Sequence, residues 1–186
     1  MLNARNVTAK HHRRAVLHEV DFMAQPGQIT AIVGPSGAGK STLLKAMTGD
    51  QPYAGQIMLN GLDVARTRSA RLAEIRAVLP QATPLAFPFT VAEVVRLGVI
   101  HGDRAAHVIA QALAQVGLAG FEGAFFQELS GGEQQRVHLA RVLAQVWHPL
   151  PDGTPRWLFL DEPVSSLDIG HQLQIMQVVQ GFAARG

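Results

Sequence analysis

The sequence contains no cysteine among its 186 residues, which excludes disulfides and thiolate metal sites. Its eight histidines include no pair at positions i and i+4 beside a third ligand, so a zinc or haem site has no support. No apolar run approaches the roughly 18 residues that a membrane-spanning helix needs, and the first five residues do not begin a signal peptide. We therefore expect a soluble, cytoplasmic chain.

The sequence also lacks a large excess of either positive or negative charge. The 16 Lys and Arg are interspersed with 14 Asp and Glu, for a formal net charge of +2. There is no basic stripe of the kind that duplex binding needs, so we expect no nucleic-acid partner. The one basic run, His11 to Arg14, is better interpreted as a solvated β-turn. With 47% hydrophobic residues, the chain can bury one core, and its length suits a single domain.

The most informative stretch is Gly34 to Thr42, GPSGAGKST, which fits the pattern G-x-x-x-x-G-K-[ST]. The apolar run Ile29 to Val33 precedes it and predicts a central strand covered on both faces, while a helix-type run follows it. Its glycines allow backbone N–H groups to wrap around a phosphate chain, Lys40 supplies a positive charge, and the Ser41 hydroxyl can bind Mg²⁺. The predicted nucleotide-binding residues of this loop are Gly34, Pro35, Ser36, Gly37, Ala38, Gly39, Lys40, Ser41 and Thr42.

The rest of the chain predicts an α/β domain with a helical insertion. Strands are expected over Leu2 to Thr8, Val16 to Met23, Gly55 to Leu59 and Ala77 to Leu79, with a turn at Asn60-Gly61 and a short helix over Ser69 to Arg76. From about Thr83 to Glu128 the pattern is helical with no strand, and it includes a capping box that begins at Thr90. An apolar helix face there is formed by Val108, Ile109, Ala112, Leu113 and Val116.

A second informative string is Leu129 to Arg136, LSGGEQQR. Ser130 and Glu133 fit a capping box, and Gly131 and Gly132 leave the first N–H groups of the following helix uncovered by side chains. Such a helix end suits a phosphate. The alternative is an ordinary helix start.

Adjacent carboxylates follow the apolar strand expected over Trp157 to Leu160. Asp161 and Glu162 at the end of a buried strand are costly unless a cation or hydrogen bonds compensate them. A metal–nucleotide site is therefore favoured over a structural pair. Further along, Asp168 is interpreted as the N-cap of a last helix whose inward residues are Leu173, Met176, Val179 and Phe182.

These strings, in this order, resemble the ATP-binding subunits of ABC transporters. Gly34 to Thr42 matches their Walker A motif, Gln81 their Q-loop and Leu129 to Arg136 their signature motif. Asp161-Glu162 matches their Walker B motif, and Ser165 to Asp168 their D-loop.

The resemblance implies a P-loop NTPase with a RecA-type core, an N-terminal antiparallel β subdomain and an inserted helical subdomain. One domain would cover residues 1–186, with residues 1–82 and about 129–186 forming the core and β subdomain. Residues of about 83–128 would form the helical subdomain.

The resemblance also implies a head-to-tail homodimer with two ATP molecules between the subunits. Ser130, Gly131 and Gly132 of one subunit would close on the γ-phosphate held by Lys40 of the other. Asp161, Ser41 and Gln81 would hold Mg²⁺, and Glu162 would orient or deprotonate the attacking water. The implied catalytic residues are Glu162, Gln81 and Lys40, and the residues implied to contact nucleotide from outside the loop are Ser130, Gly131, Gly132, Glu133 and Asp168.

Two features depart from the family pattern. The family's adenine-stacking aromatic residue would align near His12 or Arg13, where no aromatic residue stands, so affinity should rest on phosphate and Mg²⁺ contacts. The chain also ends before the family's next strand and its histidine for the γ-phosphate. We therefore expect a C-terminally truncated domain that binds ATP weakly and turns it over poorly.

Within the family, Arg76 to Gln81, Phe87 to Val95 and Val146 to Arg156 look most like the haem (hemin) importer ATPases of Gram-negative bacteria. Importers of ferric siderophores or cobalamin remain alternatives, as do a soluble ABC ATPase and a nucleotide-binding regulatory module. The resemblance implies membrane permease subunits, a periplasmic haem-binding protein, and a peripheral place on the cytoplasmic face of the inner membrane. Phe87 and Phe89 are candidates for the contact with the permease, whereas Val91, Val94 and Val95 suit the subdomain core.

Overall fold

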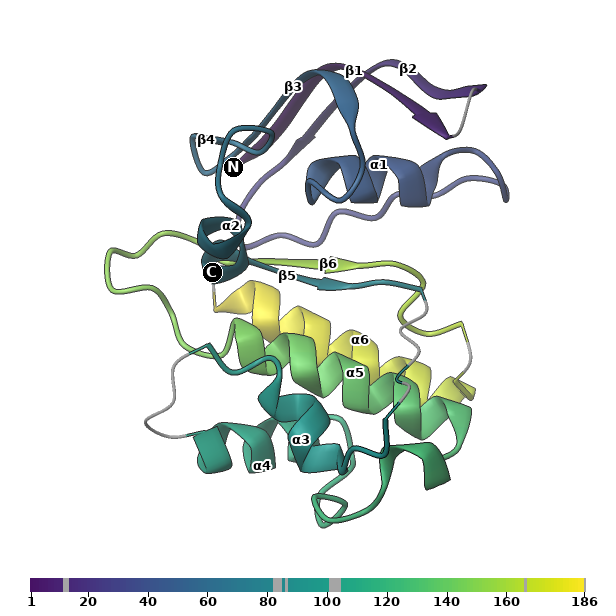
Figure 1. Cartoon of the computed structure of the whole chain (residues 1–186), viewed down its shortest axis with the longest axis vertical. Coiled ribbons are helices and arrows are strands. Elements are labelled where there is room, and N and C mark those ends of the chain that lie inside the picture. Colours follow the sequence, from purple (N-terminus) through teal and green to yellow (C-terminus); the bar gives the residue numbers. More distant parts are fainter. Residues whose placement is uncertain (12–13, 82–84, 86, 101–104, 166, 186) are drawn as a thin grey trace.

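The computed structural model describes residues 1–11, 14–81, 85, 87–100, 105–165 and 167–185. Figure 1 shows three regions stacked along the long axis of the molecule: an antiparallel sheet with one helix beneath it, a short parallel sheet, and a group of helices. The antiparallel sheet corresponds to the N-terminal β subdomain that the sequence predicts.

The N-terminal sheet has the strand order β2-β1-β3-β4, and all its neighbours are antiparallel. Its strands are β1 (Leu2–His11), β2 (Arg14–Ala24), β3 (Tyr53–Leu59) and β4 (Leu62–Asp63). Asn60 and Gly61 join β3 to β4 with φ angles of 51° and 80°, the positive pair that a tight two-residue hairpin turn needs. The predicted β subdomain and its turn are confirmed, and the β1–β2 turn at His12 and Arg13 lies outside the described residues.

Helix α1 (Lys40–Met47) packs against this sheet. Its buried residues Leu43, Ala46 and Met47 belong to the same apolar cluster as Val7 and Ile57 of the strands. Because the phosphate loop directly precedes α1, this packing holds the loop at one end of the sheet.

The prediction of a strand over Ile29 to Val33 is wrong. The segment has no strand structure, and the side chains of Ile29 and Val33 are 47% and 88% exposed. The parallel sheet contains only β5 (Arg76–Leu79) and β6 (Trp157–Leu160) among the described residues, and none of these residues pairs with the segment as a strand. An apolar run becomes a central strand only when neighbouring strands accept and donate its backbone hydrogen bonds. In Figure 1 the segment passes between α1 and the parallel sheet without joining it.

The other regular elements of the described residues are helices. They are α2 (Ser69–Ile75), α3 (Val91–Arg96), α4 (Ala105–Gln115), the 3-10 helix η1 (Phe126–Glu128), α5 (Gly131–Gln145) and α6 (Ile169–Ala184). Helix α5 is the central one, because it contacts α3, α4 and β5. The described part of residues 83–128 contains no strand beyond one isolated bridge between Thr90 and Phe125.

The helical core forms largely as predicted. Thr90 caps α3 with the expected capping box, and Val91, Val94 and Val95 are fully buried. Phe87 is exposed as predicted, but Phe89 is partly buried against the core, so only Phe87 has the exposure expected of a contact residue.

The predicted inward face of α6 is wrong in half of its residues. Ile175 is fully buried and Val179 and Phe182 pack on the core, but Leu173 and Met176 are 62% and 40% exposed. Successive residues of a helix turn by about 100°, so residues spaced by three drift steadily around the axis. The spacing of Ile175, Val179 and Phe182 keeps them on one side.

No helix in the described ranges is long and apolar enough to cross a membrane.

Candidate nucleotide-binding site

Most of the predicted site residues meet at one edge of the molecule. Figure 1 shows the loop before α1, the carboxyl ends of β5 and β6, and the starts of α5 and α6 along the same side of the view. Parallel strands bring their carboxyl ends to a common edge, which is where open α/β sheets bind ligands.

The phosphate loop has the backbone that its glycines predict. Gly37 and Gly39 have φ angles of 80° and 93°, which side chains rarely allow. A Cβ atom at Gly39 would also stand only 3.0 Å from both Leu17 Cδ2 and Val16 Cγ1, so the loop lies directly against β2. Lys40 Nζ donates to the carbonyl oxygens of Gly34 and Pro35 at 2.8 and 2.9 Å. The ammonium group is thus folded over the loop that is predicted to hold phosphate.

The loop and the β6 end are joined by one side-chain hydrogen bond. Ser41 Oγ donates to Asp161 Oδ1 at 3.1 Å, although the two residues are 120 positions apart. The backbone N–H of Asp161 donates to Leu79 O at 2.9 Å, which extends the β5–β6 pairing by one residue. The hydroxyl and the carboxylate are oxygen ligands of the type that Mg²⁺ prefers, so this pair fits the predicted metal position.

Glu162 is held at three points by residues from different elements. Gln81 Nε2, just beyond β5, donates to Glu162 Oε2 at 3.1 Å. The carbonyl oxygen of Glu162 accepts from Gln135 Nε2 at 3.2 Å, and from the N–H and Oγ of Ser165 at 3.3 and 3.2 Å. Glu162 itself has a φ of 50°, in the left-handed region that non-glycine residues seldom occupy. Sequence reasoning predicted Gln81 and Glu162 but missed Gln135 and the support from Ser165.

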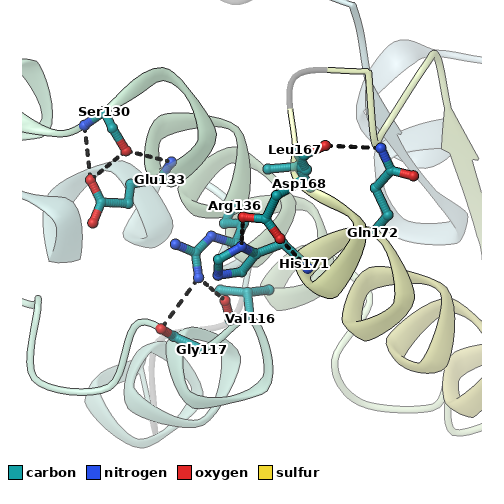
Figure 2. Close-up of polar contacts among 9 residues, drawn as sticks. All are labelled: Val116, Gly117, Ser130, Glu133, Arg136, Leu167, Asp168, His171 and Gln172. Atoms are coloured by element: carbon teal, nitrogen blue, oxygen red, sulfur yellow. Dashed lines mark hydrogen bonds and ion pairs between the residues drawn. The ribbon is translucent and has the colours of Figure 1, made fainter.

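The first turn of α5 forms the predicted capping box, which Figure 2 shows. Ser130 donates from its N–H and its Oγ to Glu133 Oε2 at 2.8 and 2.6 Å, and the Glu133 N–H donates back to Ser130 Oγ at 3.4 Å. These bonds from the Ser130 side chain and backbone lower the pKa of Glu133 below its usual value. Ser130 is exposed, and a Cβ atom at Gly131 would meet no atom within 4 Å, so this helix end faces open space.

Arg136 anchors α5 one turn further along. Its side chain is only 8% exposed, and Nη1 donates to the carbonyl oxygens of Val116 and Gly117 at 3.1 and 3.4 Å. These carbonyls lie just beyond the end of α4. No role was predicted for Arg136 from the sequence. Its charged side chain directly precedes the run Val137 to Ala140 of a buried helix, and a buried charge needs hydrogen-bond partners, so this position could have been singled out.

Asp168 is the N-cap of α6, as predicted. Its Oδ1 accepts from the His171 N–H at 3.0 Å, and its Oδ2 lies 2.5 Å from His171 Nδ1. The hydrogen bond from the His171 backbone is the main reason that the pKa of Asp168 is lowered. Gln172 Nε2 also bonds Leu167 O at 2.8 Å, which holds the segment before the helix.

The structure therefore arranges the predicted residues in two groups. One contains the loop with Lys40 and Ser41, together with Gln81, Asp161 and Glu162. The other contains the starts of α5 and α6, with Ser130, Gly131, Gly132, Glu133 and Asp168. Thr42 is half-buried in the first turn of α1. The predicted adenine position at His12 and Arg13 lies outside the described residues.

A family profile described as ABC transporter matches residues 17–165. The chain belongs to the ABC transporter family. The match spans all the motif residues up to Ser165. Among the described residues, no group of three His, Cys, Asp or Glu side chains could hold a metal ion.

Relatives in the ABC family align with the whole chain. The chain is 61% identical to a Hemin import ATP-binding protein HmuV from Jannaschia sp. (strain CCS1), and it spans 70% of that protein. It is 56% identical to the protein of the same name from Roseobacter denitrificans and spans 72% of it.

Solved ABC structures share the fold. A bacterial Atm1-family ABC exporter with ATP bound superposes with a TM-score of 0.84 at 28% identity, over 98% of this chain and 33% of that one. The ATP-binding cassette MJ0796, in a dimeric post-hydrolysis state bound to ADP and Pi, gives a TM-score of 0.82 at 26% identity, over all of this chain and 84% of that one. The predictions of a P-loop NTPase fold, of an ATP-binding domain and of an ABC-type ATP hydrolase are confirmed.

Proposed function

We propose that this chain is the ATP-hydrolysing subunit of an ABC importer that takes up hemin. For the cargo, the support is the 61% identity over the whole chain to a Hemin import ATP-binding protein. For the chemistry, the observation that carries the proposal is the hydrogen bond between Gln81 and Glu162, directly beside the Ser41–Asp161 pair.

Nucleotide binding would begin with the phosphates. The N–H groups of the Gly34 to Ser41 loop and the first turn of α1 would donate to phosphate oxygens, and Lys40 Nζ would leave its two carbonyl partners for the β- and γ-phosphates. Ser41, Asp161 and Gln81 would hold Mg²⁺. When bound, the ion neutralises charge that develops on the phosphate oxygens.

Hydrolysis would depend on Glu162. Its carboxylate would orient the attacking water and accept one of its protons at Oε1 or Oε2 while the bond between the β- and γ-phosphates breaks. Gln81 donates to Oε2, so it would hold the carboxylate in place, and its side-chain amide would also contact the attacking water. The products are ADP and inorganic phosphate.

The site would be completed by a second copy of the chain. In a head-to-tail homodimer, the exposed Ser130 and Gly131 of one subunit, with the half-buried Gly132, would face the γ-phosphate held by Lys40 of the other, and Glu133 and Asp168 would lie beside them. This is supported by the open space around Gly131 and by the dimeric MJ0796 structures with the same fold. The pairing would be isologous, so both nucleotide sites would be equivalent.

We further propose the division into a nucleotide-binding core (residues 1–82 and about 129–186) and a helical subdomain (about 83–128). The helical subdomain, through Phe87, would contact membrane permease subunits at the cytoplasmic face of the bacterial inner membrane. A periplasmic haem-binding protein would deliver the cargo on the opposite face.

The chemistry is tested by phosphate release from the purified protein. With Mg²⁺ and ATP, the unaltered protein should release phosphate, and Glu162→Gln should lower the rate at least about 100-fold while ATP binding is retained. Equal rates for the two proteins would refute the role of Glu162.

The cargo is tested by growth. Cells that lack the gene should fail to grow with hemin as the only iron source, and a plasmid copy should restore growth where Lys40→Ala does not. Normal growth on hemin combined with loss of growth on a ferric siderophore would refute hemin and favour a siderophore.

A further inference from the structure

We propose that Gln135 is a positioning residue for ATP hydrolysis, because its side-chain amide on α5 holds the backbone of Glu162. The proposal rests on the proposed function, since it concerns the carboxylate that acts on the water. Gln135 belongs to the signature string, yet its side-chain amide donates to a residue of the other group of site residues, which contains Lys40, Ser41 and Glu162. Gln135 Nε2 lies 3.2 Å from Glu162 O, and the two residues are 27 positions apart.

The backbone of Glu162 needs such support. Its φ of 50° lies in the left-handed region, and a non-glycine residue stays there only when its surroundings hold it. Three donors converge on its carbonyl oxygen. Two of them, the N–H and Oγ of Ser165, come from the loop that Glu162 itself begins, so they move with that loop. Gln135 is the donor that comes from a separate, buried helix.

The two glutamines around Glu162 act on different parts of it. Gln81 reaches the carboxylate oxygen Oε2 from the end of β5, and Gln135 reaches the main-chain oxygen from α5. A carboxylate held at one oxygen can still swing when its backbone turns. Holding both ends fixes the direction in which the carboxylate points, which is the condition for orienting a water molecule.

The side-chain amide of the neighbouring Gln134 holds a different segment of the chain. Its Nε2 donates to Phe126 O and Leu129 O at 3.2 and 3.1 Å, so it holds the chain that leads into Ser130. Helix α5 thus carries one amide that supports the start of the signature string and one that supports Glu162. A movement of α5 when its first turn meets a nucleotide would reach Glu162 through Gln135.

The test compares Gln135→Met with Gln134→Met in the purified protein. Methionine has nearly the shape of glutamine but no N–H donor, so each variant removes one amide and little volume. For Gln135→Met we expect kcat to fall about three- to tenfold and KM for ATP to stay within about twofold, because the hydrogen bond to Glu162 O that acts on hydrolysis is lost. For Gln134→Met we expect weaker ATP-driven dimerisation.

A second measurement separates positioning from general damage. In a Glu162→Gln background, where ATP is bound but not hydrolysed, the Gln135→Met change should leave the ATP-driven dimer unchanged, because Gln135 acts on hydrolysis and not on dimer formation. Gln134→Met should still weaken the dimer. Gln135→Leu, which also lacks the donor and adds no charge, should reproduce the kcat loss if Gln135→Met is unstable.

An unchanged kcat in both Gln135 variants would overturn the proposal. So would equal weakening of the dimer by Gln135→Met and Gln134→Met, which would show a structural role. If the unaltered protein releases no phosphate at all, the proposed function fails instead, so the two failures are distinct.

Discussion

Replacing Arg136 by methionine should destabilise the protein measurably. Arg136 is 8% exposed and joins α5 to the end of α4 through Val116 O and Gly117 O. A hydrogen bond from a charged group contributes about 1.5–3 kcal/mol. The bond to Val116 has an ordinary length of 3.1 Å and is buried, whereas the bond to Gly117 is long at 3.4 Å, so we assign the pair about 3 kcal/mol at most.

One feature of the site reduces this loss. Arg136 Nε is buried and has no hydrogen-bond partner among the described residues, and methionine removes that cost while keeping the apolar stem. The expected net change is about 2 kcal/mol. For a domain of this size that corresponds to a fall in Tm of about 4 to 8 °C.

The measurement is thermal unfolding followed by circular dichroism, with Arg71→Met as the matched control. Arg71 is also on a helix and pairs with Glu74, but the two side chains are 48% and 37% exposed. An exposed pair within a helix contributes about 0.3–0.5 kcal/mol, so Tm should change by at most about 2 °C. Equal shifts for the two variants would refute the importance of the buried bonds.

Three further predictions follow from the site. Gly39→Ala should lower ATP affinity more than tenfold and reduce Tm, because φ is 93° and the new Cβ atom would stand 3.0 Å from side-chain atoms of Val16 and Leu17. The control is Gly61→Ala, where φ is 80° but no atom lies within 4 Å of the new Cβ atom. Equal effects of the two substitutions would contradict the steric reason. Ser41→Ala should reduce the gain in ATP affinity that Mg²⁺ gives, measured by titration with and without the ion, while affinity without Mg²⁺ changes little. Because the pKa of Glu133 is lowered in the folded protein, the ionised side chain stabilises the fold at pH values above its unfolded pKa of about 4.5, and this stability is lost as pH falls through the lower folded pKa. Between pH 7 and about pH 3, the urea midpoint of the unaltered protein should therefore fall relative to that of Glu133→Gln. A constant difference between the two midpoints would contradict this.

The parts of the fold that sequence predicted well depend on neighbours in the chain. The capping boxes at Thr90 and Ser130 and the N-cap at Asp168 formed as expected, because each needs only residues three positions apart. The loop from Gly34 to Lys40 is similarly local.

The errors came where a distant segment decides the outcome. Ile29 to Val33 has the composition of a buried strand, but a strand exists only with a partner, and none of the described residues supplies one. The contact between Gln135 and Glu162 could not be predicted from spacing, since it depends on how α5 packs against β5, the strand that pairs with β6. On α6 the period was right for Val179 and Phe182 and wrong for Leu173 and Met176, because positions three apart do not stay on one face.

The central claim is that each ATP is shared between Lys40 of one subunit and Ser130 of the other. The most direct test mixes two variants, Lys40→Ala and Ser130→Glu, each of which should release almost no phosphate alone. In a mixed head-to-tail dimer one of the two sites is intact, so a one-to-one mixture should recover up to about one quarter of the normal ATPase rate. A mixture as inactive as its components would contradict a site built from two subunits.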